Sequence, residues 1–504
     1  MKDNEQIQLD AIDLSLLKTL PLSFTKGNLA LPVRKENGKL IGLAANAQGV
    51  FALKEIAEKD GLSFEPIKME ETALLELINR AYGMVGSAEE VMGNIVGEDL
   101  ESVATEFESP KDILELTEDA PIIRLLNALL QQAVKENASD IHIEPYEKDM
   151  LVRLRVDGML KKALTPPKLI QDALISRIKI MSNLDISEKR LPQDGRIRLL
   201  IGGKDIDIRV SIIPSVYGER AVLRLLDRKK GLISLSSVGM LQDEELIFKQ
   251  LLNNPHGIIL VTGPTGSGKT TTLYAALNTI HTEDKNIITV EDPVEYQIKG
   301  IGQININTKI GLTFASGLRS ILRHDPDVIM VGEIRDLETA EIAIQASLTG
   351  HLVLSTLHTN DAPSAITRLI DMGIEPFLLA SSLSCVVAQR LLRNICPYCR
   401  KPYQPLAIEA EYFNPPPPAL YRGSGCHYCN HTGYMGRTAI FELLQVNSHI
   451  TQLINRGINA QVIKEEAIKN GMRPLRSSGL HKAATGITTL AEVMRVTQTD
   501  YASI

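Results

Sequence analysis

One stretch of this chain combines the residue types and the spacing needed to bind phosphate. Residues 263–270 read GPTGSGKT, which fits the pattern G-x-x-x-x-G-K-[ST]. Glycines let the backbone turn so that successive N–H groups converge on phosphate oxygens. The pattern predicts that Lys269 reaches the β- and γ-phosphates of a nucleotide and that the Thr270 hydroxyl ligates Mg²⁺. The candidate nucleotide-binding residues are Gly263, Pro264, Thr265, Gly266, Ser267, Gly268, Lys269, Thr270 and Thr271.

The residues on either side of this loop predict the elements that position it. Residues 258–261 form an apolar run typical of a buried parallel strand, and residues 271–277 predict the helix that follows. The N-terminus of that helix would add partial positive charge where the phosphates lie. The alternative is a glycine-rich turn that binds nothing. A strand and a helix in register with the pattern favour the nucleotide site.

Two further apolar runs end in carboxylates that could serve the same site. The first, residues 287–290, is followed by three acids: Glu291, Asp292 and Glu295. A carboxylate at such a strand tip can activate the attacking water. The second run, residues 327–331, leads to Glu333, in the arrangement of a Walker B strand with glutamate in the usual place of aspartate near Mg²⁺. Surface acids are common, so an ordinary solvated role is the alternative for each.

A further apolar strand is predicted between two histidines, His351 and His358. One buried histidine is usually structural, whereas two that bracket a strand of such a domain could sense the γ-phosphate. Residue chemistry leaves both interpretations open. The repeated strand-then-helix units predict a parallel sheet with helices on both faces.

Four of the five cysteines form two C-x-x-C pairs with 26 residues between them: Cys396 with Cys399, and Cys426 with Cys429. Four thiolates in two such pairs predict a tetrahedral Zn²⁺ site, and a redox pair is the alternative. The gap is longer than usual, but four consecutive prolines at 415–418 indicate an extruded loop. Cys385 lies in an apolar run that we expect to be a buried helix.

A region upstream, from about residue 119 to 228, alternates like β-strands and is rich in arginine. Any one of these arginines could simply be solvated beside an aspartate. As a set they favour anion contact beside a nucleotide site. They are Arg196, Arg198, Arg209, Arg220 and Arg224.

Length and composition exclude several classes of protein. A chain of 504 residues is too long for one core and predicts three or four domains. The net charge of −7 gives no global attraction to nucleic acid. No apolar run approaches the roughly 20 residues of a membrane helix, and no signal peptide is evident. Paired cysteines favour a metal in a reducing compartment. We therefore expect a cytoplasmic protein whose membrane association would come through a partner.

Together these motifs resemble the secretion ATPase superfamily, specifically the type II secretion ATPase (GspE) family. Four motifs occur in the family's order: the phosphate loop, an aspartate box (288–296), a Walker B box (319–336) and a histidine box (349–362). Residues 138–146, residues 191–197 and the four cysteines extend the resemblance over about residues 119–504. Residues 1–105 carry no matching motif; they predict a small α/β module, for which binding and inert packing both stay open.

The resemblance implies an α/β multidomain fold built around a RecA-like parallel-sheet P-loop ATPase domain. A small N-terminal α/β domain and a PAS-like α/β domain would precede it. A tetracysteine zinc subdomain and a helical C-terminus would follow it. The expected boundaries are 1–105 for the platform-binding domain, 106–118 for a linker, 119–230 for the arginine-bearing PAS-like domain, 231–256 for a connector, 257–390 for the ATPase core, 391–440 for the zinc subdomain and 441–504 for the helical subdomain.

The function implied by the resemblance is that of a homohexameric motor using ATP, Mg²⁺ and Zn²⁺. It would work in the cytoplasm, peripheral at the inner membrane, and power pseudopilus assembly for protein export. Its implied partners are the cytoplasmic domains of the L-type and F-type platform components, without direct nucleic acid contact. By position, Glu295 resembles the general base and Glu333 the Walker B carboxylate. His351 and His358 resemble the histidine-box residues, and Arg209 and Arg224 resemble arginines that approach the γ-phosphate.

Three alternatives to this function stay open. A type IV pilus extension motor shares most of the motifs, the zinc pairs included. A nucleic-acid-pumping ATPase is disfavoured because the chain has no Trp, only 4% aromatic residues and no basic patch interleaved with aromatics. A nucleotide-gated scaffold without turnover is disfavoured by the presence of both Glu295 and Glu333.

Overall fold

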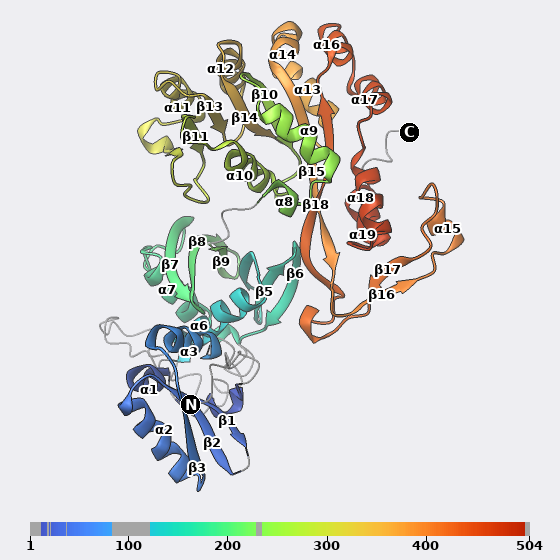
Figure 1. Cartoon of the computed structure of the whole chain (residues 1–504). Coiled ribbons are helices and arrows are strands. Elements are labelled where there is room, and N and C mark those ends of the chain that lie inside the picture. Colours follow the sequence, from blue (N-terminus) through green and yellow to red (C-terminus); the bar gives the residue numbers. More distant parts are fainter. Residues whose placement is uncertain are drawn as a thin grey trace. The chain divides into compact units, whose positions relative to one another are not determined.

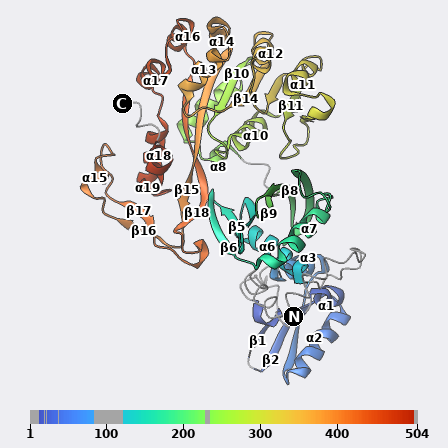
Figure 2. The ribbon, with the colours of Figure 1, turned by 180° about the vertical axis from the view of Figure 1, so that it is seen from behind.

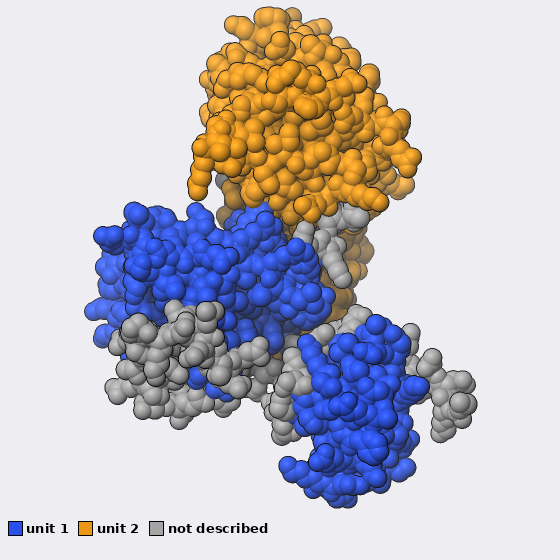
Figure 3. Space-filling model, turned by 90° about the vertical axis from the view of Figure 1, so that its left-hand side faces the viewer, with its two compact units in different colours: residues 1–229 blue, residues 230–504 orange. Residues whose placement is uncertain are grey.

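The computed structural model describes residues 12–17, 20, 22–36, 38–82, 121–227 and 234–498 (Figure 1). The chain divides into two compact units, residues 1–229 and 230–504, which Figure 3 colours separately. The linker expected at 106–118 lies outside the described residues.

The first unit begins with a small α/β module. Its sheet has β2 in the centre, antiparallel to β1 and parallel to β3. Buried Leu31, Leu43 and Leu74 hold the core between the sheet and the helices. The elements are η2 (Leu14–Leu17), α1 (Leu22–Asn28), β1 (Ala30–Glu36), β2 (Lys39–Ala44), α2 (Ala47–Lys59), β3 (Ser63–Lys68) and α3 (Glu71–Tyr82).

The rest of the first unit is a six-stranded antiparallel sheet in the order β6-β5-β4-β9-β8-β7. One face is apolar and packs on helices α6 and α7 through residues such as Ile141, Ile208 and Leu223. Because neighbouring residues of a strand point to opposite faces, the charged residues fall on the other side. The elements are α6 (Pro121–Lys135), β4 (Asp140–Pro145), β5 (Met150–Val156), β6 (Met159–Leu164), η4 (Lys168–Ile170), α7 (Gln171–Met181), β7 (Gln193–Ile201), β8 (Lys204–Ser215) and β9 (Gly218–Asp227).

The second unit is built on a seven-stranded sheet in the order β12-β11-β13-β14-β10-β15-β18. Six of these strands are parallel to their neighbours, and only β18 is antiparallel. The predicted parallel sheet is confirmed. Its strands are β10 (Gly257–Thr262), β11 (Ile287–Glu291), β12 (Gly302–Asn305), β13 (Val328–Val331), β14 (Leu352–Leu357), β15 (Leu383–Ile395) and β18 (Tyr434–Gln445).

Helices cover both faces of this sheet, as the strand–helix repeats predicted. Ile258 and Leu260 of β10 point to one face and Ile259 and Val261 to the other, and all four are fully or almost fully buried. The first face packs on α11 (Phe314–Ile321), α12 (Leu337–Leu348), α13 (Ala362–Asp371) and α14 (Pro376–Ser382). The second packs on α8 (Leu235–Val238), α9 (Gln242–Leu252) and α10 (Lys269–Ile280). Burial on both faces explains the continuous apolar runs in the sequence.

Strands β15 and β18 extend beyond the helical layers as a two-stranded ribbon, visible from both sides in Figures 1 and 2. At its far end lie β16 (Arg400–Tyr403), α15 (Ala407–Ala410), β17 (Leu420–Gly423), η7 (His427–Cys429) and the four paired cysteines. Cys385 corrects one prediction, because it lies in β15 and not in a helix, although it is fully buried as expected. A fully buried parallel strand and a buried helix have the same uninterrupted apolar sequence.

The predicted helical subdomain, residues 441–504, begins with the last five residues of β18 and is helical after them. The helices are α16 (Ser448–Asn455), α17 (Ala460–Lys469), α18 (Leu475–Ala484) and α19 (Leu490–Val496). Glu442 of β18 is 1% exposed and accepts the N–H groups of Ala362, at the start of α13, and Leu475, at the start of α18. Burial raises the pKa of this carboxyl to about 7. One side chain thus ties the parallel sheet to two helix N-termini.

The C-terminal helices also hold the connector, of which residues 234–256 are described. Lys482 is 2% exposed, and its ammonium donates to the carbonyls of Gly239 (2.5 Å) and Ala439 (2.6 Å) and to the Thr438 hydroxyl (2.8 Å). A Cβ on Gly239 would lie 2.3 Å from that hydroxyl oxygen, so only glycine permits this approach. Arg473 binds the side chains of Asp243 and Glu244 at the start of α9. The connector is therefore a folded part of the second unit.

Candidate active site

The carboxyl ends of four adjacent strands bring the candidate catalytic segments to one edge of the sheet. The phosphate loop follows β10, His358 follows β14, Glu333 follows β13, and Asp292 to Glu295 follow β11. Parallel strands end at the same edge, which is where α/β sheets bind ligands. Strand β14 lies between β10 and β13, so the phosphate loop and Glu333 start about 10 Å apart.

The phosphate loop has the conformation that its glycines predict. Gly263 has φ +148° and Gly268 φ +88°, and both pack against Gln389 of β15. A Cβ would lie 2.5 Å from the Gln389 carbonyl at Gly263 and 2.9 Å from its Nε2 at Gly268. The Gln389 side chain also accepts the Thr272 hydroxyl at 2.7 Å. The loop is thus a backbone cradle supported by one buried glutamine.

Lys269 begins α10, at the helix N-terminus, as the pattern predicted. Its ammonium donates to the carbonyls of Gly263 (2.7 Å) and Pro264 (3.2 Å). Burial lowers the pKa of Lys269 below its ordinary value, and the negative charge of Glu333 offsets part of that shift. Lys269 and Glu333 are therefore electrostatic neighbours across β14.

Glu333 joins two further groups at this edge. Its carboxylate is 15% exposed, forms an ion pair with Arg335 and lies 3.4 Å from Nε2 of His358. The hydrogen bond to Glu333 raises the pKa of Arg335, and the charge of Asp292 raises it further. Sequence reasoning did not single out Arg335, which brings a cation between the two acidic segments.

The histidine-box loop is fastened to the phosphate-loop strand. Thr262, the last residue of β10, hydrogen-bonds the Thr359 hydroxyl at 2.8 Å and accepts the Thr359 N–H at 2.8 Å. His358 is thereby held at the carboxyl edge. His351 lies at the opposite end of β14, about 23 Å from His358 by the rise of seven residues. Its Nδ1 is 2.8 Å from the Ala346 carbonyl oxygen. Within the chain, the structure brings His358 to the site and leaves His351 at the far edge.

The acids after β11 have different surroundings. Glu291 is 3% exposed and accepts hydrogen bonds from Thr289 (2.5 Å), Tyr274 (2.6 Å) and Gln303 (3.2 Å). Burial raises the pKa of Glu291, while those three donors lower it. Asp292 is exposed, and Glu295 is partly exposed. Glu291 is thus enclosed by protein groups, whereas Asp292 is exposed and Glu295 is partly exposed with its Oε2 atom buried.

The arginines of the first unit form a row across its sheet. Arg196, Arg209 and Arg224 are direct cross-strand neighbours on β7, β8 and β9, and Asp140 of β4 continues the row. Arg224 is 57% exposed and its Nε donates to Asp140 at 3.0 Å. Residues directly opposite share one face, so the structure gathers these cations on the polar side of the sheet.

The four paired cysteines converge at the end of the ribbon. Their sulfur atoms lie within 4.8 Å of one another. Neighbouring sulfurs are 3.7 to 3.9 Å apart, against about 3.8 Å for the edge of a tetrahedron with Zn–S bonds of about 2.3 Å. The N–H groups of Cys426 and Gly433 each point at the Cys429 sulfur at 3.2 Å. Although burial opposes it, these donors lower the pKa of Cys429 to about 6. The donor set fits a divalent zinc ion.

Comparison with known proteins assigns the family. A model described as "Type II/IV secretion system protein" matches residues 115–495. The chain belongs to this secretion ATPase family. Type II secretion system protein E of Aeromonas hydrophila is 48% identical over 501 residues, 98% of this chain and 99% of that protein. Type II secretion system ATPase E of Vibrio cholerae is 51% identical over 442 residues, 86% of this chain and 88% of that protein.

A pilus protein is also similar to this secretion ATPase. The type IV pilus assembly ATPase PilB of Myxococcus xanthus is 44% identical over 497 residues, 97% of this chain and 88% of that protein. Among solved structures, the pilus retraction motor PilT with bound ADP has a TM-score of 0.51 and 28% identity, over 74% of this chain and 96% of that one. The Legionella pneumophila ATPase DotB has a TM-score of 0.57 and 20% identity, over 77% and 98%, which supports the fold. The chain is an ATP hydrolase with a RecA-like core.

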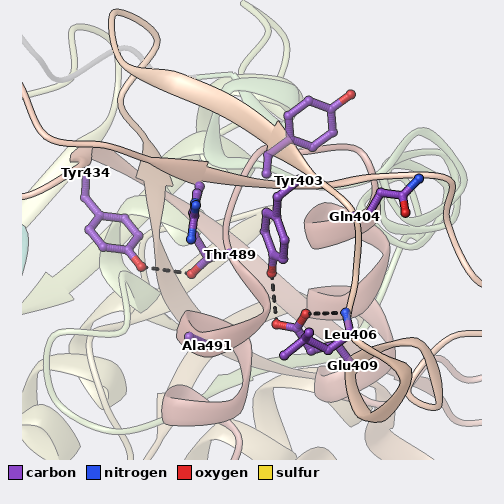
Figure 4. A pocket seen from close by; sticks show the side chains of 9 residues that line it. Tyr403, Gln404, Leu406, Glu409, Tyr434, Thr489 and Ala491 are labelled. Atoms are coloured by element: carbon purple, nitrogen blue, oxygen red, sulfur yellow. Dashed lines mark hydrogen bonds between the residues drawn. The ribbon is translucent and has the colours of Figure 1, made fainter.

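A groove of about 410 Å³ lies elsewhere in the secretion ATPase, beside β16, β17 and α19 (Figure 4). The Tyr403 hydroxyl donates to Glu409 at 3.0 Å, and the Tyr434 hydroxyl lies 2.8 Å from that of Thr489. These polar groups stabilise the base of the arm, the segment of residues 396–433 that carries the four paired cysteines. The residues that line this groove are separate from the candidate nucleotide-binding residues 263–271. Among the described residues, no helix has the length and apolar character to cross a membrane.

We predict that the secretion ATPase carries roughly one zinc ion per chain and that Cys396→Ser releases it. The arm has little core of its own, so metal loss should lower its stability and expose residues 396–433 to protease. Elemental analysis and limited proteolysis of the freshly purified chain measure both effects. Cys385→Ala removes a thiol outside the cluster and should leave the zinc content unchanged. A zinc-free wild-type chain with a protease-resistant arm would refute the assignment.

Proposed function

We propose that this secretion ATPase works as a cytoplasmic homohexamer that powers pseudopilus assembly and protein export by a type II secretion system. The observation that carries the proposal is the 48% identity with the Aeromonas type II protein. That match spans 98% of the chain, so it includes the N-terminal module as well as the motor. Residues 1–105 would bind the cytoplasmic domains of the L-type and F-type platform components, and membrane association would be indirect, without nucleic acid contact.

In the proposed nucleotide site, residues 263–271 bind the phosphates of ATP through backbone N–H groups and Lys269. The Thr270 hydroxyl and Glu333 would hold Mg²⁺, which would neutralise phosphate charge when bound. The electrostatic proximity of Lys269 and Glu333 supports this arrangement. The contact between His358 and Glu333 supports a γ-phosphate-sensing role for His358. The position of His351 favours a structural role at the amino edge of β14.

The general base of the proposed mechanism is Glu295. It must accept a proton from the water that attacks the γ-phosphate. Glu291 is poorly suited because it is buried and already accepts three protein hydrogen bonds. Glu295 is partly exposed on the loop that follows, so a water can reach it. Asp292 lies close enough to Arg335 for its negative charge to raise the pKa of that arginine.

The proposed role of Arg209 and Arg224 is to complete the site in the assembled ring. An arginine supplied to the γ-phosphate stabilises transition-state charge and can add a large factor in rate. This role is supported by the cross-strand row of arginines. Within it, Arg224 forms an ion pair with Asp140 and its side chain remains more than half exposed. Separate compact units would allow one to close on a motor domain after ATP binds.

A type IV pilus extension motor is the second candidate, because PilB of Myxococcus xanthus is 44% identical over 97% of the chain. The two candidates share the chemistry of ATP hydrolysis and differ in the filament that is assembled.

Replacing Glu295 by glutamine should lower kcat by about 100-fold or more, because an amide cannot take a proton from water. Affinity for ATP should stay within about twofold of wild type, since the phosphate loop is untouched. Steady-state turnover and titration with a fluorescent ATP analogue measure the two quantities. Glu341→Gln removes an exposed carboxylate on α12 and serves as the control. Wild-type turnover by Glu295→Gln would exclude this base.

Turnover per chain should rise with protein concentration as the ring assembles, and Arg224→Ala should abolish most of that rise. The measurement is specific activity across the assembly range, with the oligomeric state followed by light scattering. Lys161→Ala, on the edge strand β6 of the same sheet, is the control for loss of a cation. An unchanged rise in the arginine variant would remove Arg224 from the site.

A cellular experiment separates the two machines. In the organism that encodes the chain, Lys269→Ala at the native locus should stop export, and the exported proteins should accumulate in the periplasm. Surface pili should be unaffected. Loss of pili with normal export would instead establish the pilus motor.

A further inference from the structure

We propose that Tyr274 is a positioning residue for ATP hydrolysis. Its hydroxyl fixes the loop that carries Glu295 relative to the phosphate loop. The inference rests on the proposed role of Glu295 as general base. Tyr274 lies on α10, five residues after Lys269, so the helix that begins at the phosphate loop also carries this hydroxyl.

The hydroxyl of Tyr274 has a complete set of partners. It donates to Oε2 of Glu291 at 2.6 Å and accepts the backbone N–H groups of Glu295 at 3.2 Å and Tyr296 at 3.4 Å. Nε2 of Gln303 also lies 3.4 Å from this hydroxyl. A phenol has one proton and two lone pairs, so these contacts use its full capacity. The side chain is 3% exposed, which isolates the three interactions from competing water. Two of them hold the backbone of the proposed base and its neighbour.

A second side chain holds the same loop from another direction. Gln303 of β12 donates to Glu291 at 3.2 Å and to the Tyr296 carbonyl at 2.9 Å, and it accepts the Ile298 N–H at 2.8 Å. Gln303 therefore ties the loop to the edge of the sheet. Tyr274 ties it to the helix of the phosphate loop. Removing the Tyr274 hydroxyl takes away one long contact of Gln303, at 3.4 Å, and leaves its contacts with Glu291, Tyr296 and Ile298. The loop should therefore stay folded and lose its fixed distance from the nucleotide.

This division of labour matters because general base catalysis depends on distance. The base must lie about 2.6 to 3.2 Å from the atom whose proton it takes. A displacement of about 1 Å can cost on the order of 100-fold in rate. The Tyr274 ring also contacts that of Tyr296 edge-on, with centroids 5.8 Å apart, and phenylalanine would retain this packing. The hydroxyl and the ring can therefore be tested separately.

The test is Tyr274→Phe. We expect kcat to fall about 10- to 100-fold while affinity for a fluorescent ATP analogue stays within about twofold. The matched control is Tyr434→Phe, which removes a hydroxyl that is hydrogen-bonded to Thr489 at the base of the arm. This control should keep wild-type kcat. A thermal transition of Tyr274→Phe well below that of Tyr434→Phe would overturn the proposal, because the hydroxyl would then maintain the fold and not the loop position.

The double variant shows whether the hydroxyl acts through Glu295. Tyr274→Phe combined with Glu295→Gln should turn over no more slowly than Glu295→Gln alone, because effects through one group are not additive. A full multiplicative loss would overturn positioning. If Tyr274→Phe keeps wild-type kcat while Glu295→Gln is inactive, positioning by Tyr274 is also overturned, and the assignment of Glu295 as the base stands. Substantial turnover by Glu295→Gln would reject the base itself.

Discussion

Parallel pairing of β11, β13, β14 and β10 is the constraint on which the site depends. It places four loops with different chemistry at one edge, over strands that are buried on both faces. Polar side chains beneath that edge then fix each loop separately. Gln389 supports the phosphate loop, Thr262 the histidine loop, and Tyr274 the loop after β11. A buried hydrogen-bonded group of this kind is costly to leave unsatisfied, so each support is rigid.

The same sheet organises the parts that surround the site. Glu442 on β18 binds the starts of α13 and α18, and Lys482 on α18 binds the connector at Gly239. These contacts join the C-terminal helices, the sheet and the connector into one folded body. Residues 441–504 bear no catalytic pattern of their own, and their function in the fold is to hold this frame together.

Local patterns made much of this structure predictable. The phosphate loop, the apolar strands and the cysteine pairs each depend on residues close in sequence, and the family resemblance supplied their order. The type of one buried element and the partners of the buried polar side chains were not predictable from the sequence. The helix expected at Cys385 is a strand, because a fully buried strand has no alternation to read. The far position of His351 follows from strand direction. Tyr274 and Gln389 are buried residues with a polar group in largely apolar segments. Such a residue indicates a buried hydrogen bond, but the sequence does not show which group is the partner.

Strand β15 supports the phosphate loop and leads directly into the first cysteine pair. Gln389 lies under the phosphate loop, and Cys396 follows the last residue of the strand. Seven residues of extended chain span about 23 Å, so Cys396 lies far from the residue that supports the phosphate loop. A tilt of about 10° at Gln389 would carry the cysteine end through about 4 Å. A small rearrangement beneath the phosphate loop would therefore become a displacement large enough for another molecule to detect.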